Sequence, residues 1–183
     1  LSLGCAPLVA ADVLTGPVRV CAATGSTGSG ASAKQTTHHP ERFSNLRAYK
    51  VFQHQHVPEI QSFLSHLGAV PQIDFVPMSA PLDRGIFATI FADVKPDVDV
   101  REIFHHAYDS KPLVRLRSAS PDLRMLRGTA LADVSIHQDG ETVAILVAID
   151  NLGKGAAAQA IQALNISLGR RETEGLLLPT SSP

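Results

Sequence analysis

The sequence predicts an α+β fold, in which a largely antiparallel mixed sheet carries helices on one face. Along the chain, short strand-like segments of alternating or β-branched residues alternate with segments of helical periodicity. Near the end, two strand-like segments, 131–138 and 141–150, flank Asp139-Gly140, a strong signal for a two-residue hairpin. The 183 residues, 44% hydrophobic and 18% charged, fit one soluble globular domain.

The first 45 residues are expected to form a helix, a strand and a long loop. An apolar, helix-like run predicts a helix over 5–14, which Thr15-Gly16-Pro17 would end. The β-branched run over 18–24 predicts a strand. Residues 25–45 are small and polar without periodicity, and a loop of that length in a compact domain is usually functional or disordered.

The middle of the chain is expected to contribute three strands and a helix. A strand over 48–54 precedes a helix that runs from Pro58, which suits a first helical turn, to Gly68, which suits a helix stop. Alternating patterns predict strands over 72–78 and 85–94, with turn-forming Pro and Asp residues between them.

The C-terminal part adds a helix and a short strand before the hairpin, and a second helix after it. Apolar residues at helical spacing predict the helix over 99–109, and the strand follows over 112–118. An Ala-rich helix is expected over 153–168. The folded domain is expected to cover 1–175, and 176–183 to form a flexible tail.

The overall composition argues against two classes of partner. A formal charge of -1 predicts no broad attraction to nucleic acid or to an anionic membrane surface. No apolar run approaches the roughly 18 residues of a membrane-spanning helix. Cys5 and Cys21 do not make a disulfide scaffold, so we expect free thiols in a reducing, cytoplasmic compartment.

Cys5 is a candidate nucleophile. It would stand at the N-terminus of the first predicted helix, and a helix N-terminus or a nearby imidazole lowers the pKa of a thiol. The alternative is a buried structural cysteine, which is the commoner role of a single cysteine.

The stretch His54-Gln55-His56 is a second candidate. Residues two apart in an extended segment point to the same side, so the two imidazoles suit a paired acid/base or a metal. The pairs at 38–39 and 105–106 make zinc conceivable, but no third ligand stands at a telling spacing and no HExxH motif is present. We therefore predict no metal site.

Two glycine-containing segments suit anions. The loop 25–30 follows a strand and offers backbone amides that can cradle phosphate, although it matches neither a Walker loop nor a dinucleotide fingerprint. Lys154 lies between two glycines ahead of a predicted helix, where an anion would be favoured. A flexible loop and a capped helix with a solvated lysine are the respective alternatives.

Three longer strings of the sequence are "AATGSTGSGASAKQTTHHPERFSNLRAYKVFQHQHVPEI", "APLDRGIFAT" and "AIDNLGKGAAAQAIQALN". Together they resemble motifs of one family, the N-acetyl-gamma-glutamyl-phosphate reductases and their relatives. The resemblance keeps the order and spacing of these motifs from Cys5 to about Gly175. It implies the fold of the catalytic domain of glyceraldehyde-3-phosphate dehydrogenase-like and semialdehyde dehydrogenase enzymes, acting as catalytic and dimerisation domain over 1–175.

The resemblance also implies roles for individual residues. Cys5 occupies the place of the family's acyl-accepting thiol, and one imidazole of the His pair acts as acid/base while the other contacts substrate. We favour His56 for the acid/base and His54 for the substrate contact. Further substrate contacts are implied for Arg84, Thr24, Gly25 and Gly28, and contacts with the nicotinamide cofactor for Asn151, Lys154 and Gly155.

The implied reaction is the reduction of an acyl phosphate. The Cys5 thiolate attacks N-acyl-glutamyl phosphate, phosphate leaves, and the thioester accepts a hydride from NADPH to give the semialdehyde of arginine biosynthesis. Alternatives are the related reductase of carrier-protein-linked aminoadipyl phosphate in lysine biosynthesis, and a non-catalytic dimerisation or interaction remnant. Arg42, Arg47 and Lys50 supply positive charge that an acidic carrier would favour.

Some features depart from the family's pattern. Ala6-Pro7-Leu8 replaces a Tyr-Pro-Thr sequence, and Gln55 and Ala31 replace arginines. The family's N-terminal Rossmann domain has no counterpart, so we expect the chain to be truncated, to work with a separate chain that carries that half, or to be a free-standing remnant. In each case reductase activity without the NADP-binding half is not expected. The Cys5 helix and the helix 153–168 would pack on that half, and a homo-dimer or homo-tetramer is expected.

Overall fold

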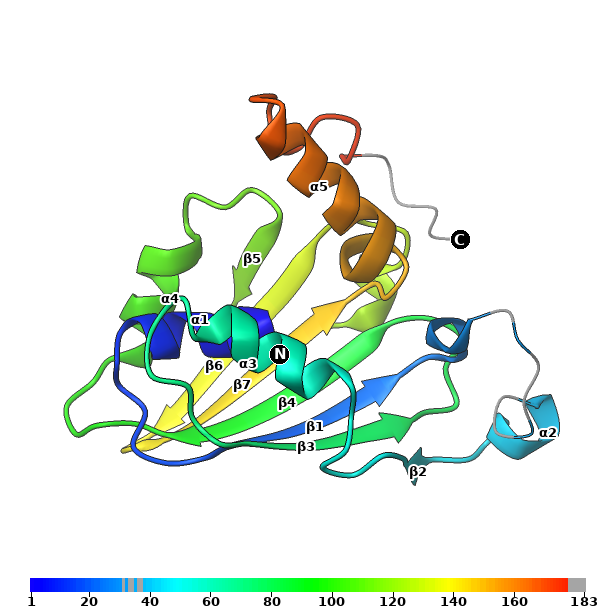
Figure 1. Cartoon of the computed structure of the whole chain (residues 1–183), viewed down its shortest axis with the longest axis horizontal. Coiled ribbons are helices and arrows are strands. Elements are labelled where there is room, and N and C mark those ends of the chain that lie inside the picture. Colours follow the sequence, from blue (N-terminus) through cyan, green and yellow to red (C-terminus); the bar gives the residue numbers. More distant parts are fainter. Residues whose placement is uncertain (31, 33–34, 36–37, 178–183) are drawn as a thin grey trace.

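The computed structural model describes residues 1–30, 32, 35 and 38–177. One mixed sheet forms the centre, and α1, α3 and α4 cross one of its faces while α5 projects beyond the end of β7, an inner strand (Figure 1). Its seven strands are β1 (Val18–Thr24), β2 (Arg47–Ala48), β3 (Ile73–Ser79), β4 (Ile86–Asp93), β5 (Val114–Arg117), β6 (Ala132–Asp139) and β7 (Thr142–Ile149), in the order β2-β3-β1-β4-β7-β6-β5.

The predicted α+β class is confirmed, since the sheet is largely antiparallel and its helices lie on one face. Only the β1–β3 and β5–β6 pairs are parallel among the described strands. The helices are α1 (Ser2–Ala10), α2 (His39–Arg42), α3 (His56–Leu64), α4 (Val100–Tyr108) and α5 (Ala158–Ser167), with 3-10 turns over Ser26–Ser29 and Leu123–Leu126 and a π-helical turn over Gly153–Ala157. No helix of the described residues is long and apolar enough to cross a membrane.

The core lies between the sheet and α1. Leu8 and Val9 of α1 pack on alternate residues of the strands, among them Ile90 and Ile145, all with almost no exposure. Gly4 lies so near the sheet that a Cβ there would stand 2.3 Å from Ile90 Cδ1. A glycine at this position therefore lets the start of α1 sit directly on β4 and β7.

The other face of the sheet carries a different set of side chains. Phe87, Phe91 and Leu146 alternate with the core residues of β4 and β7, and Phe91 is 47% exposed. On β6 the same side carries Asp133, whose carboxylate accepts two hydrogen bonds from Arg115 at 2.6 and 3.0 Å. None of the described helices covers these apolar residues, so this surface, the open sheet face, remains free in the single chain.

Two predicted elements differ in extent. The first helix begins at Ser2 instead of residue 5 and ends at Ala10, because Asp12 adopts a left-handed conformation with φ of 53°. The predicted strand 48–54 is wrong beyond β2, because Lys50 and Phe52 have φ of 44° and 58°, which a strand does not admit.

Three other segments also differ from expectation. The loop 25–45 contains the turn Ser26–Ser29 and α2, and the last helix starts with a π-helical turn. The hairpin turn lies one residue later than expected, since Asp139 pairs with Thr142. Leu176 is buried beside Leu113, while residues 178–183 of the predicted tail lie outside the described residues.

Candidate active site

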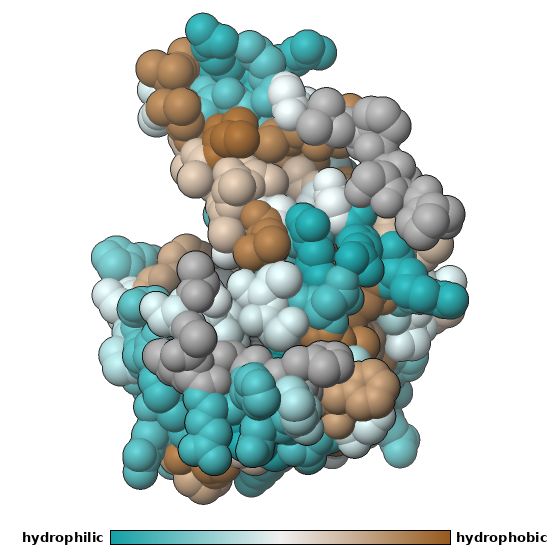
Figure 2. All heavy atoms as spheres, turned by 90° about the vertical axis from the view of Figure 1, so that its right-hand side faces the viewer, coloured by the Kyte–Doolittle hydropathy of each residue, from teal (hydrophilic) through white to brown (hydrophobic). Residues whose placement is uncertain are grey.

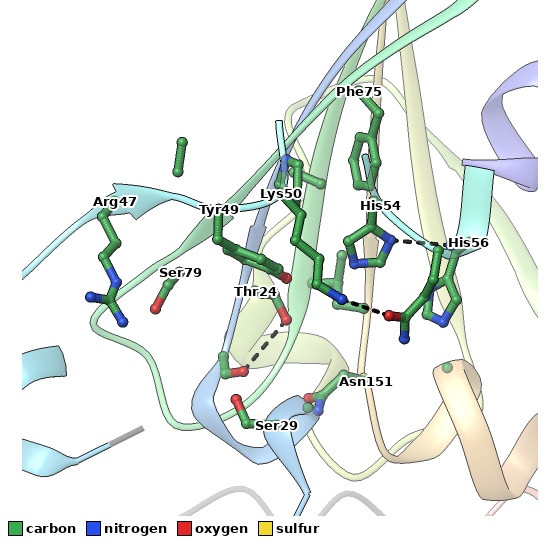
Figure 3. Close-up of a pocket in the computed structure, with 18 of the residues that line it drawn as sticks. Thr24, Ser29, Arg47, Tyr49, Lys50, His54, His56, Phe75, Ser79 and Asn151 are labelled. Carbon is green, nitrogen blue, oxygen red and sulfur yellow. Dashed lines mark hydrogen bonds between the residues drawn. The ribbon is translucent and has the colours of Figure 1, made fainter. Parts of the chain in front are cut away.

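A cavity of about 850 Å³ opens on the helix-covered face, where β1 and β3 end. Figure 3 shows its polar side chains converging from the loop after β1, from β2 and the segment that follows it, and from the start of α3. In Figure 2, α5 rises above the body of the domain and carries apolar side chains. The charged and aromatic groups that line the cavity include Arg42, Arg47, Tyr49, Lys50, His54 and His56.

His54 is held in a fixed position at the cavity wall. Its ring lies edge-on to those of Phe75, at 5.2 Å, and His56, at 4.8 Å, and the His56 backbone N–H donates to His54 Nδ1 at 3.3 Å. That bond leaves Nδ1 unprotonated, so the neutral ring carries its proton on Nε2. His54 is therefore set to donate one hydrogen bond through Nε2.

The charge state of His54 follows from its surroundings. Burial lowers the pKa of His54 below its ordinary value, and His56 and Lys50 act in the same direction while Glu59 opposes them. The neutral form is favoured near neutral pH. His56 itself is exposed and begins α3, so it faces more solvent than His54.

The two imidazoles come together for a reason other than the one predicted. Gln55 is helical and caps α3, so the segment is not extended and period-two alternation does not apply. The rings are neighbours because the chain turns into the helix between them. Lys50 Nζ donates to Gln55 Oε1 at 2.7 Å and fixes the approach of the preceding loop.

The loop Thr24–Gly30, predicted to receive a phosphate through its amides, lines the cavity, and three of these amides are bonded within the protein. The amides of Gly25, Ser26 and Thr27 donate to the carbonyls of residues 85, 82 and 83 at 2.9 to 3.0 Å. A Cβ at Gly25 would lie 2.6 Å from the Arg84 amide nitrogen, so this close approach requires glycine. Because these amides already have acceptors, they cannot also bind an anion without breaking those bonds.

Arg84, predicted to bind substrate, forms a structural ion pair. Its Nε lies 2.7 Å from Oδ2 of Asp150, a carboxylate with no exposed surface. Burial alone would raise the pKa of Asp150, but hydrogen bonds from the amides of Gly128, Gly153 and Leu152 and from Arg84 outweigh it, so the pKa is lowered. Arg84 is not among the residues that line the cavity.

Asn151 continues this network and lines the cavity as well. Its Oδ1 accepts from the Gly85 amide at 2.6 Å, and its Nδ2 donates to Thr27 Oγ1 at 2.9 Å. The loops 24–30, 82–85 and 150–153 are thereby joined. We name this set of hydrogen bonds and its ion pair the Asp150 network.

The other two predicted cofactor residues separate. Gly155 lines the cavity, whereas Lys154 is buried and its Nζ donates to Gln162 Oε1 on α5 at 2.5 Å. Burial lowers the pKa of Lys154, while the nearby Glu172 carboxylate opposes the shift. Lys154 therefore ties the π-helical turn to α5 and does not reach the cavity.

Cys5 lies apart from the cavity in this structure. It is fully buried in α1 and does not line the cavity, and burial raises the pKa of its thiol to about 11. Desolvation outweighs the opposite effect of the positively charged amino group of Leu1, so the lowering of the pKa that the sequence suggested is not found. Tyr108 of α4, whose hydroxyl donates to the Leu3 carbonyl at 2.7 Å, covers this part of α1.

Tyr49 and Ser79 line the cavity without having been predicted as part of the site, and Arg42 was predicted only as positive charge that would favour an acidic carrier. Arg42 is 9% exposed, and its Nη2 donates to the carbonyls of Thr24 and Ala80 at 3.3 and 3.2 Å. Its sequence signal was weak, because an arginine in a polar loop is usually solvated. Among the described residues, no group of three His, Cys, Asp or Glu side chains is placed to hold a metal ion.

Comparison with known proteins gives a consistent result. Residues 1–151 match the family model described as semialdehyde dehydrogenase, dimerisation domain. The chain is 39% identical to an N-acetyl-gamma-glutamyl-phosphate reductase of Methanosarcina acetivorans, over 100% of this chain and 56% of the relative. It is 42% identical to one of Methanococcus maripaludis, over 95% and 53%. The chain thus spans about half the length of these relatives.

The fold is shared with solved structures of lower sequence similarity. Aspartate semialdehyde dehydrogenase II of Vibrio cholerae superposes with a TM-score of 0.70 at 13% identity, over 91% of this chain and 59% of that one. A probable aspartate-semialdehyde dehydrogenase of Pseudomonas aeruginosa gives 0.70 at 17% identity.

Proposed function

Because the chain belongs to the semialdehyde dehydrogenase dimerisation-domain family, we propose that it supplies the acyl-transfer half of an NADP-dependent N-acyl-glutamyl-phosphate reductase. The relatives named N-acetyl-gamma-glutamyl-phosphate reductase support this choice of substrate. The product would be the semialdehyde used in arginine synthesis.

The cavity carries this proposal. It brings two imidazoles together with three cations, Arg42, Arg47 and Lys50, and no Asp or Glu is among the residues that line it. Such a site favours an anion next to groups that can move a proton. An acyl phosphate that also carries a free carboxylate is an anion that such a site would favour.

The proposed chemistry divides the roles among three residues. The Cys5 thiolate attacks the acyl carbon, a thioester forms and phosphate leaves with the electrons of the broken C–O bond. His54, with its proton on Nε2, donates a hydrogen bond to the acyl oxygen, and His56 takes the proton of the thiol before attack and returns it to the thiolate that leaves when the aldehyde forms. NADPH, when bound, supplies the hydride that reduces the thioester.

The fit to NADP is incomplete in this chain. Asn151 and Gly155 line the cavity, but Lys154 is engaged with Gln162 on α5. We therefore propose that most of the nucleotide site lies in the part of the related reductases that has no match in this chain. The described residues alone do not define a step of the nucleotide's chemistry.

The proposal requires that α1 move. A fully buried thiol with a pKa of about 11 is almost entirely protonated at neutral pH and cannot attack a ligand in the cavity. The first turn of α1 would have to shift, so that Cys5 reaches His56 and its thiol pKa falls.

A chimera tests the proposal. Residues 1–183 would replace the matching part of the Methanosarcina acetivorans relative, and phosphate-dependent reduction of NADP by N-acetylglutamate semialdehyde would be followed by absorbance. We expect activity in the chimera, a loss of at least about 1,000-fold in Cys5→Ser, and full activity in the control Cys21→Ser. A chimera that folds and binds nucleotide but shows no activity, or a fully active Cys5→Ser variant, would contradict the proposal.

A second candidate function rests on the open sheet face. Its exposed Phe91, beside Phe87 and Leu146, fits a non-catalytic role in which the chain only pairs with a second copy. The family description names dimerisation, and pairing through this face is compatible with either function. The chimera separates the two, since a purely structural module would dimerise without activity.

A further inference from the structure

Two arginines without an assigned role stand at one end of the cavity. Arg47 of β2 pairs with Ser79 on β3, whereas His54 contacts Phe75 on the same strand. Ser79 and Phe75 point to the same face of β3 and are four residues apart, which is two full alternations or about 13 Å along the strand. The arginine end and the imidazole end of the cavity are therefore distinct.

Arg42 joins Arg47 at the arginine end. Its Nη2 is fixed by the carbonyls of Thr24 and Ala80, which lie at the ends of β1 and β3. A guanidinium has five N–H donors, so this anchoring positions the group and leaves other donors for a ligand. Arg42 also lies close to the hydroxyl of Tyr49. Burial raises the pKa of Tyr49, and the positive charge of Arg42 partly opposes that rise.

No other group described at the cavity can replace these cations as the anion's main partner. The amides of Gly25, Ser26 and Thr27 are bonded within the protein. Lys50 stands with Gln55, toward the imidazole end (Figure 3). No carboxylate is among the described residues that line the cavity, so the lining as a whole favours an anion.

Resting on the proposed function, we propose that Arg42 and Arg47 bind the carboxylate of the substrate that is not phosphorylated, and so determine its specificity. The phosphate is bonded to the acyl carbon, so it must lie at the imidazole end during attack. The remaining carboxylate lies at the far end of a glutamyl chain. A planar carboxylate matches a guanidinium through paired hydrogen bonds.

The burial of Arg42 decides between a small ligand and a carrier protein. With 9% of its surface exposed, Arg42 cannot form part of a rim on which an acidic protein docks. Only a group that enters the cavity can contact it. The two arginines therefore favour a free amino-acid derivative over a docked carrier.

The test compares two unreactive ligands by calorimetry on the 183-residue chain. N-Acetylglutamate carries both carboxylates, and 4-acetamidobutyrate lacks the one assigned to the arginines. We expect N-acetylglutamate to bind at least about tenfold more tightly, as one charge-assisted pair implies. Arg47→Gln should remove this difference and leave the affinity for 4-acetamidobutyrate unchanged.

Controls make each outcome decisive. Arg19→Gln, on the opposite face of the sheet, should change neither affinity, and Arg47→Lys should restore only part of the difference, because lysine lacks the paired donors. If Arg47→Gln weakens both ligands equally, or neither, the assignment is overturned while the proposed function stands. If neither ligand binds the native chain, the assignment is overturned too, and activity of the chimera then decides whether the proposed function falls with it.

Discussion

At the scale of single residues, His54 is the most closely constrained group of the cavity. Its Nδ1 accepts a backbone N–H, three neighbouring rings confine it, and burial favours its neutral form. A neutral imidazole with a fixed tautomer is a hydrogen-bond donor of known direction. This makes it suited to hold an acyl oxygen while another group moves the proton.

The charges around His54 give a testable shift of its pKa. Lys50→Gln should raise the pKa of His54 toward its ordinary value, because one cation is removed, and Glu59→Gln should lower it further. Proton NMR titration of the ring measures both. The two substitutions must shift the pKa of His54 in opposite directions. Shifts in the same direction would mean that the charges of Lys50 and Glu59 do not act on this ring.

The same shift affects stability with a definite sign. The folded protein binds the His54 proton less tightly than the unfolded chain does, because the pKa of the ring is lowered on folding. Neutral His54 therefore favours the folded state: the free energy of unfolding is highest above pH 6.5 and decreases as the pH falls through the lowered pKa. Lys50→Gln should reduce that loss.

Residue identities could be predicted from the sequence better than residue environments. The motifs pointed to His54, His56 and Asn151, and all three line the cavity. Nothing in the sequence indicated that Arg84 would pair with Asp150, because the two are far apart in the chain and the pair forms only when two loops meet. Burial of Cys5 likewise depends on how α1 packs.

At the scale of elements, the Asp150 network joins the end of β7 to the loops before and beside it. The carboxylate accepts from Gly128, Leu152 and Gly153 at 2.6 to 2.8 Å and pairs with Arg84. The Asp150 carboxylate therefore fixes the start of the π-helical turn. This π-helical turn leads into α5 and sets the direction in which α5 leaves the domain.

Asp150→Asn should therefore destabilise the fold strongly. An amide keeps one acceptor oxygen and leaves Arg84 without its counter-charge, a loss of about 3 to 5 kcal/mol in the free energy of unfolding. Denaturant titration measures it. Asp12→Asn, which breaks the exposed pair with Lys95, is the control and should cost less than about 1 kcal/mol. Equal effects of the two changes would contradict a structural role for the network.

Element types were predicted more securely than their ends. The strand 18–24 and the helix over 99–109 matched closely, because each has a clear period and a clear stop. The strand expected over 48–54 is wrong beyond β2, because no local sequence signal indicates the left-handed conformations of Lys50 and Phe52. Those conformations arise where the chain bends from the edge of the sheet into α3.

At the scale of the whole molecule, the two faces of the sheet have different partners. One face is covered by the chain's own helices, and the open sheet face presents Phe87, Phe91 and Leu146. A surface of this kind is stabilised when a second copy covers it. Pairing through the sheet would also leave the cavity accessible, because the cavity lies on the opposite face.

Phe91→Glu should shift a dimer toward monomer. A buried charge on each copy would weaken association by about tenfold or more, which sedimentation equilibrium detects. Phe63→Glu is a matched control, since Phe63 on α3 is also 47% exposed but lies on the helix side. Dissociation by the Phe63 change alone would place the interface elsewhere.

The Asp150 network has a consequence for how this protein can change over generations. Arg84 and Asp150 come from separate parts of the sequence, yet neither keeps its partner if the other is replaced. Asn151 and Thr27 share the same dependence. Mutations at these positions should be tolerated only as coordinated exchanges, so the cavity wall is expected to be inherited as a unit while the exposed loops around it diverge freely.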